Sequence, residues 1–234
     1  MDFRILLSSP HYVAAVKPFG VLSEDDGSAG CMAGLLRSAG IASLYPVHRL
    51  DRTTEGLMLW ARTREAASIL SAEAQSGAFS KVYRALLSAD PALPPAGELR
   101  DRLYFDRRRD KAFVVTGERK GSKEAVLRYT LGEPFDWRGH SITPARVELL
   151  TGRTHQIRVQ FASRRSPLAG DGKYGSRLNY KSPSLFCEEI RFSWEGEEIA
   201  VTLPPSPNAE PPPRGIGKDS SCPPSISPTP SPGL

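Results

Sequence analysis

Residues 46–59 read Pro46-Val47-His48-Arg49-Leu50-Asp51-Arg52-Thr53-Thr54-Glu55-Gly56-Leu57-Met58-Leu59. The stretch places one carboxylate, Asp51, among a histidine and two arginines, and then continues into an apolar run over Leu57–Ala61. An apolar run of this length predicts a buried strand. Asp51 is therefore expected on a loop that a packed strand holds in place, which is a common position for functional side chains.

Short β-like runs surround this strand, and a few helical patterns separate them. The predicted strands are Phe3–Leu7, Tyr12–Val16, Leu57–Ala61, Val82–Leu87, Ala112–Val115, Ala125–Leu131, Ala145–Leu150, Ile190–Trp194 and Ile199–Leu203. The predicted helices are Ala29–Ala39, Arg64–Ser76 and Thr154–Ala162. Strands that follow one another closely favour antiparallel or mixed pairing over a regular βαβ series. We therefore predict an α+β fold with a large, mainly antiparallel sheet flanked by helices and loops.

A second segment repeats the style of the first, since Thr151-Gly152-Arg153-Thr154-His155-Gln156-Ile157-Arg158-Val159 also crowds arginines and a histidine together. Thr154 is the predicted N-cap of the third helix, which places His155 and Arg158 on one face near the positive end of the helix dipole. Such a face suits a phosphate or a carboxylate. Alternatively, the two arginines of the segment are solvated surface charges and His155 caps a neighbouring carbonyl.

Asp51 has two interpretations as well. A lone aspartate in a loop is most often a cap or a surface ion-pair partner. A nucleophilic aspartate must stay ionised and be held still, and one arginine can do both. The candidate arginines are Arg49, Arg52, Arg153 and Arg158.

Composition narrows the class of protein. The chain has 234 residues, 39% of them hydrophobic, and a net charge of +5, which favours a polyanionic partner only weakly. Cysteines and histidines are scattered without metal-ligand spacing, so we expect neither a disulfide framework nor a metal site. No apolar stretch is long enough for a signal peptide or a membrane span, and we expect an intracellular, cytoplasmic protein.

The C-terminal residues 204–234 differ from the rest of the chain. They hold 11 of the 21 prolines and almost no large apolar side chains. Such a segment cannot offset the entropy cost of folding. We predict one folded domain over residues 1–203 and a disordered Pro/Ser-rich tail over residues 204–234.

Taken together, the motifs resemble those of the RluA-type pseudouridine synthases. The resemblance rests on five pieces in order: Val16-Lys17-Pro18-x-Gly20, His48-Arg49-Leu50-Asp51 with Thr54-x-Gly56-Leu57-x-Leu59, Lys81-x-Tyr83-x-Ala85, Thr151–Val159, and Leu168-x-Gly170-Asp171-x-x-Tyr174-Gly175. It spans about residues 3–203, and several ordered motifs are far more specific than any one of them.

The resemblance implies the pseudouridine synthase fold and a cofactor-free isomerisation of uridine in RNA. Similar enzymes act on ribosomal and transfer RNA, and we expect a compact stem-loop of one of these as the substrate, no metal, and a monomer as the default state. In that family the aspartate that matches Asp51 is the nucleophile, which helps to break the N1–C1′ bond before C5 is joined to C1′. Tyr83 matches the tyrosine that packs on the target base and can help to remove the C5 proton. Arg158 matches the arginine that pairs with the catalytic carboxylate, and Arg49 the residue that enters the RNA where the uridine has left the stack.

A basic run follows Tyr83 in the chain. We predict that this run and Arg153 form the RNA-binding surface. It holds Arg100, Arg102, Arg107, Arg108, Arg109 and Lys111, interleaved with Tyr104 and Phe105. Cationic and aromatic side chains together favour contacts with RNA phosphates and bases. Alternatively, the run is a solvated β-hairpin whose aspartates are the partners of its own arginines.

The chain departs from the family pattern at a few positions. Glu55 stands where a serine is usual and would raise the pKa of Asp51 if both carboxylates faced one pocket. Gln160 stands where a histidine is frequent, and Cys187-Glu188-Glu189 replaces a usual His-Ala segment. We also expect no small S4-like RNA-binding module before the catalytic domain, because the first strand begins within a few residues of Met1.

Two other functions fit the same residues. One is a catalytically idle RNA-binding protein of the same fold. The other is a carboxylate-dependent N-glycosidase that uses Asp51 and Glu55 as an acid/base pair.

Overall fold

The computed structural model describes residues 2–88, 91–178 and 183–203. Its centre is one mixed sheet with the strand order β1-β2-β4-β11-β5-β10-β8-β6-β7, to which β12, β3 and β9 add at β11, β4 and β10. The strands are β1 (Arg4–Ser8), β2 (Tyr12–Lys17), β3 (Tyr45–Pro46), β4 (Glu55–Ala61), β5 (Ser80–Ser88), β6 (Ala96–Asp106), β7 (Lys111–Val115), β8 (Lys123–Leu131), β9 (Phe135–Trp137), β10 (His140–Leu149), β11 (Leu185–Trp194) and β12 (Glu197–Thr202). The helices are α1 (Met32–Ser38), α2 (Arg64–Ser76), α3 (Gln156–Ala162) and the 3-10 helix η1 (Gly172–Tyr174). The predicted α+β fold is confirmed.

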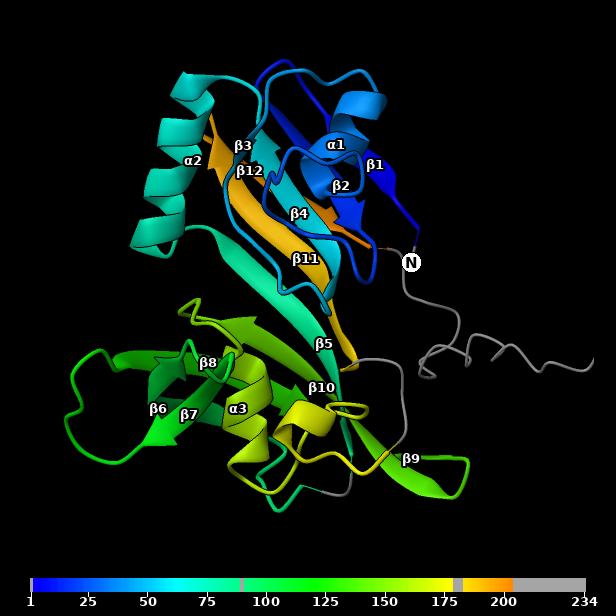
Figure 1. The fold of residues 1–234 in the computed structure, drawn as a ribbon, viewed down its shortest axis with the longest axis vertical. Coiled ribbons are helices and arrows are strands. Elements are labelled where there is room, and N and C mark those ends of the chain that lie inside the picture. The colour runs from blue at the N-terminus through cyan, green and yellow to red at the C-terminus, as the bar shows by residue number, and fades with distance from the viewer. Residues whose placement is uncertain (1, 89–90, 179–182, 204–234) are drawn as a thin grey trace, which may run out of the picture.

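Strand β5 divides the sheet into two lobes. The first lobe contains β1–β4, β11 and β12 with α1 and α2, and the second contains β6–β10 with α3 and η1 (Figure 1). β5 pairs with β11 on one side and with β10 on the other, both antiparallel. Of the pairings between the strands, only that of β4 with β11 is parallel in the described part of the chain. The lobes are therefore parts of one continuous hydrogen-bonded sheet.

Strand β4 is the apolar run that follows the Asp51 loop, and all seven of its residues are buried. Neighbouring strands pair with both of its edges, and Leu57, Met58 and Leu59 belong to the main hydrophobic cluster of the first lobe. A strand covered on both faces reads as a continuous apolar segment, which is why this one was predictable. Its packing gives the Asp51 loop a fixed end.

Gly56 explains why the motif contains a glycine at this point. Its φ of +115° lies in a region that L side chains rarely adopt, and a Cβ there would collide with the backbone of Cys187. Gly56 sits opposite Cys187 in the parallel pairing of β4 with β11. The glycine lets the two strands approach each other directly below the Asp51 loop.

Helix α2 matches its predicted bounds, because both of its ends carry strong signals. The Thr63 side chain accepts a hydrogen bond from the Ala66 N–H, and Gly77 ends the helix in the left-handed conformation. Helix α1 begins three residues later than predicted, with Cys31 at the N-cap. No helix among the described residues is long and apolar enough to span a membrane.

Two sequence predictions fall short in the second lobe. Strand β6 was not predicted as an element, although the expected β-hairpin is present as the β6–β7 pair. Strand β10 begins at His140, five residues before its predicted start, and contains Pro144. Along β10, the residues paired with β9 end at Ile142 and those paired with β8 begin at Ala145. Pro144, which has no N–H to donate, lies in the gap between these two pairings. The predicted tail, residues 204–234, lies outside the described residues.

Candidate active site

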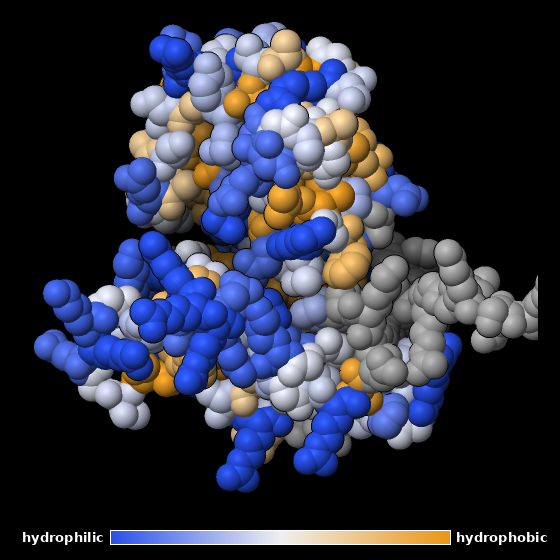
Figure 2. Space-filling view, in the orientation of Figure 1, coloured by the Kyte–Doolittle hydropathy of each residue, from blue (hydrophilic) through white to orange (hydrophobic). Residues whose placement is uncertain are grey.

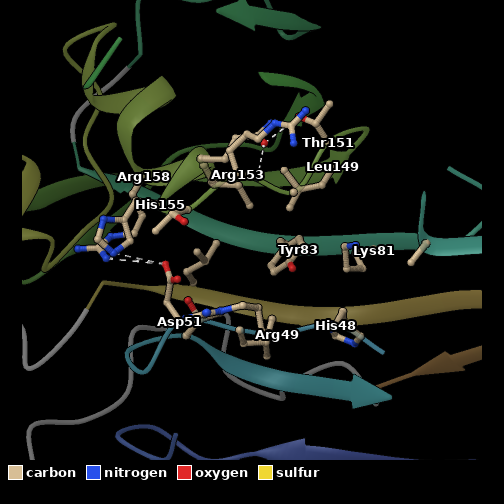
Figure 3. Close-up of a pocket in the computed structure, with 18 of the residues that line it drawn as sticks. His48, Arg49, Asp51, Lys81, Tyr83, Leu149, Thr151, Arg153, His155 and Arg158 are labelled. Atoms are coloured by element: carbon tan, nitrogen blue, oxygen red, sulfur yellow. Dashed lines mark hydrogen bonds and ion pairs between the residues drawn. The ribbon is translucent and has the colours of Figure 1, made fainter. Parts of the chain in front are cut away.

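A cavity of about 520 Å³ lies where the two lobes meet. Figure 2 shows hydrophobic residues at the boundary between the lobes and strongly hydrophilic side chains gathered over the second lobe. Most of the cavity wall comes from three segments far apart in sequence: the Asp51 loop, strand β5, and the turn that leads into α3 (Figure 3). The residues of these segments that line it are Val47, His48, Arg49, Leu50, Asp51, Thr54, Lys81, Tyr83 and residues 149–158. The two motifs that the sequence singled out therefore form opposite walls of one cavity.

The Asp51 loop is held by neutral hydrogen bonds on both sides of the aspartate. Thr54 N–H donates to the Asp51 carbonyl at 2.9 Å, and Ser23 Oγ both donates to the Leu50 carbonyl and accepts from its N–H. His48 Nε2 accepts from the Leu59 N–H at 3.1 Å, which ties the loop to β4. Burial lowers the pKa of His48 to about 3, so the imidazole is a neutral acceptor at physiological pH.

Lys17 supports the loop from beneath. It is completely buried at the end of β2, and its Nζ donates to the carbonyls of Pro18 and Arg52 at 3.0 and 3.2 Å. Burial lowers the pKa of Lys17 to about 8, and the charges of Glu55 and Asp51 oppose this shift. Glu55 is buried in β4 and is not among the residues that line the cavity. The Glu55 carboxylate therefore balances Lys17 and does not share the cavity with Asp51.

Arg158 is a buried arginine with two carboxylate partners. Its Nε and Nη2 donate to the two oxygens of Asp171 at 2.6 and 2.8 Å, and its Nη1 lies 3.9 Å from Asp51 Oδ2. Only 5% of the Arg158 side chain is exposed, which excludes the interpretation of this residue as a solvated surface charge. The bidentate ion pair with Asp171 fixes the plane of the Arg158 guanidinium, and its Nη1 faces Asp51.

The start of α3 differs from the prediction. The helix begins at Gln156 with His155 at the N-cap position and no side-chain cap, so Thr154 is not its N-cap. The Gln156 side chain reaches back to the turn before the helix, where its Oε1 accepts from the Arg153 N–H at 3.0 Å and from Thr151 Oγ1 at 2.8 Å. His155 adopts a left-handed conformation with φ of +55°, and its Nε2 lies 3.8 Å from Asp51 Oδ2.

Tyr83 and Lys81 project into the cavity from β5 (Figure 3). Tyr83 is 4% exposed, and burial raises its pKa well above the ordinary value of a phenol. Cys187 lies opposite Tyr83 in β11, and burial raises the pKa of this thiol to about 12. Tyr83 is therefore a neutral ring on the cavity wall, packed against a neutral thiol.

The predicted RNA-binding arginines occupy different places. Arg49 lines the cavity, is 65% exposed and forms an ion pair with Glu24. Arg153 lines both this cavity and a second one of about 800 Å³, and its Nε donates to the Glu124 carbonyl. The second cavity is lined by Leu103, Tyr104, Phe105, Asp106, Arg107, Arg108, Ala112, Gly121, Lys123 and residues 152–154.

The hairpin interpretation of the basic run is partly correct. Arg107 and Arg108 line the second cavity, whereas Arg109 pairs with Asp106 at 3.8 Å and lines neither. Arg100 pairs with Glu98 and Glu124 on the surface of the sheet. The two cavities share residues 152–154, so the basic hairpin side of the second lobe is continuous with the Asp51 site.

Sequence reasoning missed the roles of Asp171 and Tyr174. Both were quoted as part of a motif, but they lie more than 100 residues from Asp51 and were assigned no contact. Gln160, a departure from the family pattern, is buried and donates to the Leu99 carbonyl and to Asp101 Oδ2. It ties α3 to β6 and does not reach the cavity. Within the described ranges, no group of three or more His, Cys, Asp or Glu residues could hold a metal ion.

The family of the chain follows from its sequence and its fold together. Residues 11–163 match the family described as RNA pseudouridylate synthase. The match covers more than half of the chain and includes the Asp51 loop, β5 and the whole of α3. The chain belongs to this family.

Particular relatives support the assignment. The chain is 34% identical over 192 residues to ribosomal large subunit pseudouridine synthase D of Pseudomonas aeruginosa and 38% identical over 182 residues to that of Xylella fastidiosa. The alignments cover 76% and 74% of this chain but only 55% and 52% of those proteins, so the chain spans about half the length of the curated relatives it matches. The solved structure of human RNA pseudouridylate synthase domain containing 1 superposes with a TM-score of 0.75 at 21% identity, covering 87% of this chain and 83% of that one. This likeness confirms the fold.

Proposed function

We propose that this protein is an RNA pseudouridine synthase that isomerises a uridine in structured RNA with Asp51 as its catalytic carboxylate. The carrying observation is that Asp51, Arg158 and Tyr83 meet at one cavity although they come from three separate segments. The reaction is balanced without a cofactor: the N1–C1′ bond breaks, C5 bonds to C1′, C5 loses a proton and N1 gains one.

Each wall residue has a separate task in this scheme. Arg158 places a positive charge beside the Asp51 carboxylate, and Asp171 keeps Arg158 in place. Tyr83 offers its ring to the extruded uracil, which offsets part of the cost of unstacking. Because the pKa of Tyr83 is raised, a neutral phenol faces the base, and the C5 proton is not taken by a preformed phenolate. Arg49, exposed at the rim, fills the gap that the uridine leaves.

The second cavity extends the site along the RNA strand. Arg107, Arg108 and Arg153 supply positive charge there, and Tyr104 and Phe105 supply rings. This combination suits the phosphates and bases next to the target uridine. Because curated relatives are named for the large ribosomal subunit, we propose that the substrate is a stem-loop of ribosomal RNA and not of transfer RNA. We also propose that the enzyme is a monomer.

The N-glycosidase alternative requires a second carboxyl group in the cavity, and Glu55 does not supply it. Asp51 is the one carboxylate among the described residues that line the cavity, since Glu55 does not line it. A glycosidase pair would need two carboxyl groups flanking the scissile bond. The idle-binder alternative is disfavoured by the contact between Arg158 and Asp51, which a protein that only binds RNA has no need to maintain.

The test is an incubation of the protein with uridine-labelled ribosomal RNA, followed by digestion and separation of nucleosides. We expect pseudouridine, with no free uracil. Asp51→Asn should lower the rate by a factor on the order of 10⁴ or more while RNA binding persists. Asp136→Asn, at an exposed position of β9 that lines neither this cavity nor the second one, serves as the matched control and should keep full activity. Release of uracil would identify a glycosidase, and full activity of Asp51→Asn would refute the assignment.

A further inference from the structure

A chain of buried polar groups leads away from Asp51 on the side of His155. The Ala112 N–H donates to the Tyr174 hydroxyl at 2.8 Å, and this hydroxyl lies 3.0 Å from His155 Nδ1. At the other edge of the imidazole, Nε2 lies 3.8 Å from Asp51 Oδ2. His155 is 8% exposed and Tyr174 9%, so few of these groups can exchange their partners for water.

The hydrogen-bond pattern distinguishes the two neutral tautomers of His155. The Tyr174 oxygen already accepts the Ala112 N–H, and its own proton needs an acceptor. With the imidazole proton on Nε2, Nδ1 accepts the phenol proton and Nε2–H faces the Asp51 carboxylate. With the proton on Nδ1, the phenol proton loses this acceptor, and the Nε2 lone pair faces a carboxylate. Each such buried mismatch is unfavourable, because a buried polar group without a partner does not recover the hydrogen bonds that it makes to water.

Two cations and two carboxylates face His155: Arg158, Lys173, Asp51 and Asp110. Burial lowers the pKa of His155, although Asp51 opposes this shift. Arg158 lies over the Tyr174 ring, 5.0 Å from its centroid, and already supplies one positive charge beside Asp51. A neutral imidazole is therefore the form that this surrounding favours.

We infer that Tyr174 holds His155 in the tautomer with its proton on Nε2, so that His155 and Arg158 together engage Oδ2 of Asp51 and leave Oδ1 to react. The inference rests on the proposed function for its chemistry. Both neighbours lie nearest the same oxygen, at 3.8 Å for His155 Nε2 and 3.9 Å for Arg158 Nη1. These separations are too long for hydrogen bonds, and a shift of about 1 Å on substrate binding would form them.

His155 is a positioning residue in this scheme, because it acts through Asp51. A neutral donor orients the carboxylate without adding a second full positive charge, which would weaken it as a nucleophile. The left-handed backbone of His155 supports the assignment, since such a conformation in a residue other than glycine is concentrated at functional sites. Phe105 packs edge-on against the imidazole and helps to fix its plane.

The first experiment reads the tautomer directly and does not depend on activity. Nitrogen-15 labelled histidine in the full protein gives separate NMR signals for protonated and unprotonated ring nitrogens, and the spectrum of His155→Gln identifies the signals of His155. We expect Nε2 protonated and Nδ1 unprotonated at pH 7. Tyr174→Phe should increase the share of the other tautomer. A His155 that is cationic or protonated on Nδ1 in the wild type, or a tautomer unchanged in Tyr174→Phe, would overturn the inference.

The second experiment separates positioning from folding by kinetics. His155→Leu removes the donor and should lower kcat by about 100-fold with little change in KM. His155→Gln keeps an N–H near the position of Nε2 and should recover most of the loss, and Tyr174→Phe should show a smaller loss of the same kind. Equal kcat in the Leu and Gln variants would contradict a role for the donor. If no pseudouridine forms at all, the proposed function fails while the NMR result still decides the tautomer.

Discussion

Lys17 illustrates how a residue outside the cavity controls the geometry within it. Its ammonium group is buried and donates to two backbone carbonyls. One of these carbonyls belongs to Arg52, the residue that follows Asp51. The sequence showed Lys17 only as part of a weak motif. Its environment could not be read from composition, because a lysine is seldom fully buried.

The lowered pKa of Lys17 makes its contribution to stability depend on pH. Between the native value of about 8 and the unfolded value of 10.5, the unfolded chain binds more protons, so stability rises with pH in this window. From pH 7.5 to pH 10 the wild type should gain about 2 kcal/mol in the free energy of unfolding relative to Lys17→Met. Urea denaturation at the two pH values measures this difference.

An exposed lysine supplies the control for this prediction. Lys120 lies in a surface loop, so Lys120→Met should keep a constant difference from the wild type across the same pH range. A difference between the wild type and Lys17→Met that stays flat, or that shrinks with rising pH, would show that Lys17 is not the buried ammonium described above.

At the scale of elements, Gly56 joins strand packing to the site. It is the point where β4 and β11 run parallel, directly after the Asp51 loop. Gly56→Ala should lower the free energy of unfolding by about 3 kcal/mol or more, because the added methyl group meets the Cys187 backbone. Gly139→Ala, where φ is +78° but space is open, should cost only about 1–2 kcal/mol. Equal losses in denaturation experiments would mean that strain in φ, and not crowding, explains both.

Elements whose signals are local could be predicted from the sequence. The α2 helix has Thr63 at one end and Gly77 at the other, and β4 is a continuous apolar run. Strand β6 could not be predicted, because its exposed arginines resemble those of a solvated loop and its pairing with β8 is a long-range contact. The predicted start of α3 at Thr154 is wrong because the helix begins at Gln156 without a side-chain cap, and the Gln156 side chain binds the Arg153 N–H of the preceding turn.

The residues of the site also divide into those that the sequence identifies and those whose role depends on long-range contacts. The family resemblance selects Asp51, Tyr83 and Arg158 as site residues, and the structure brings all three to one cavity. The carboxylate of Asp171 and the hydroxyl of Tyr174 act on the site through contacts that only the fold creates. The orientation of Glu55 likewise depended on strand pairing, which places it beside Lys17 and away from the cavity lining.

At the scale of the whole molecule, the two cavities predict a division between binding and chemistry. Replacing Arg107 and Arg108 with alanine should weaken RNA binding and reduce the slope of log affinity against log salt by about 1–2, while kcat at saturating RNA stays unchanged. Arg128 and Arg146 are exposed and line neither cavity, so their double alanine variant removes the same charge elsewhere. Titrations at several salt concentrations compare the two. Equal weakening by both pairs would assign the effect to net charge and not to the second cavity.

The continuity of the sheet through β5 determines which partner deforms when substrate binds. Seven residue pairs join β5 to β10 and six join it to β11, so the lobes cannot swing apart without breaking this ladder. A protein built in this way keeps its conformation on binding, and the RNA must change its conformation to fit the cavity. For the RNA substrate proposed above, uridines whose neighbours stack weakly, in loops or beside mismatches, then reach the cavity at the lowest energetic cost. Selection among target sites would in that case reflect how easily each RNA gives up its shape.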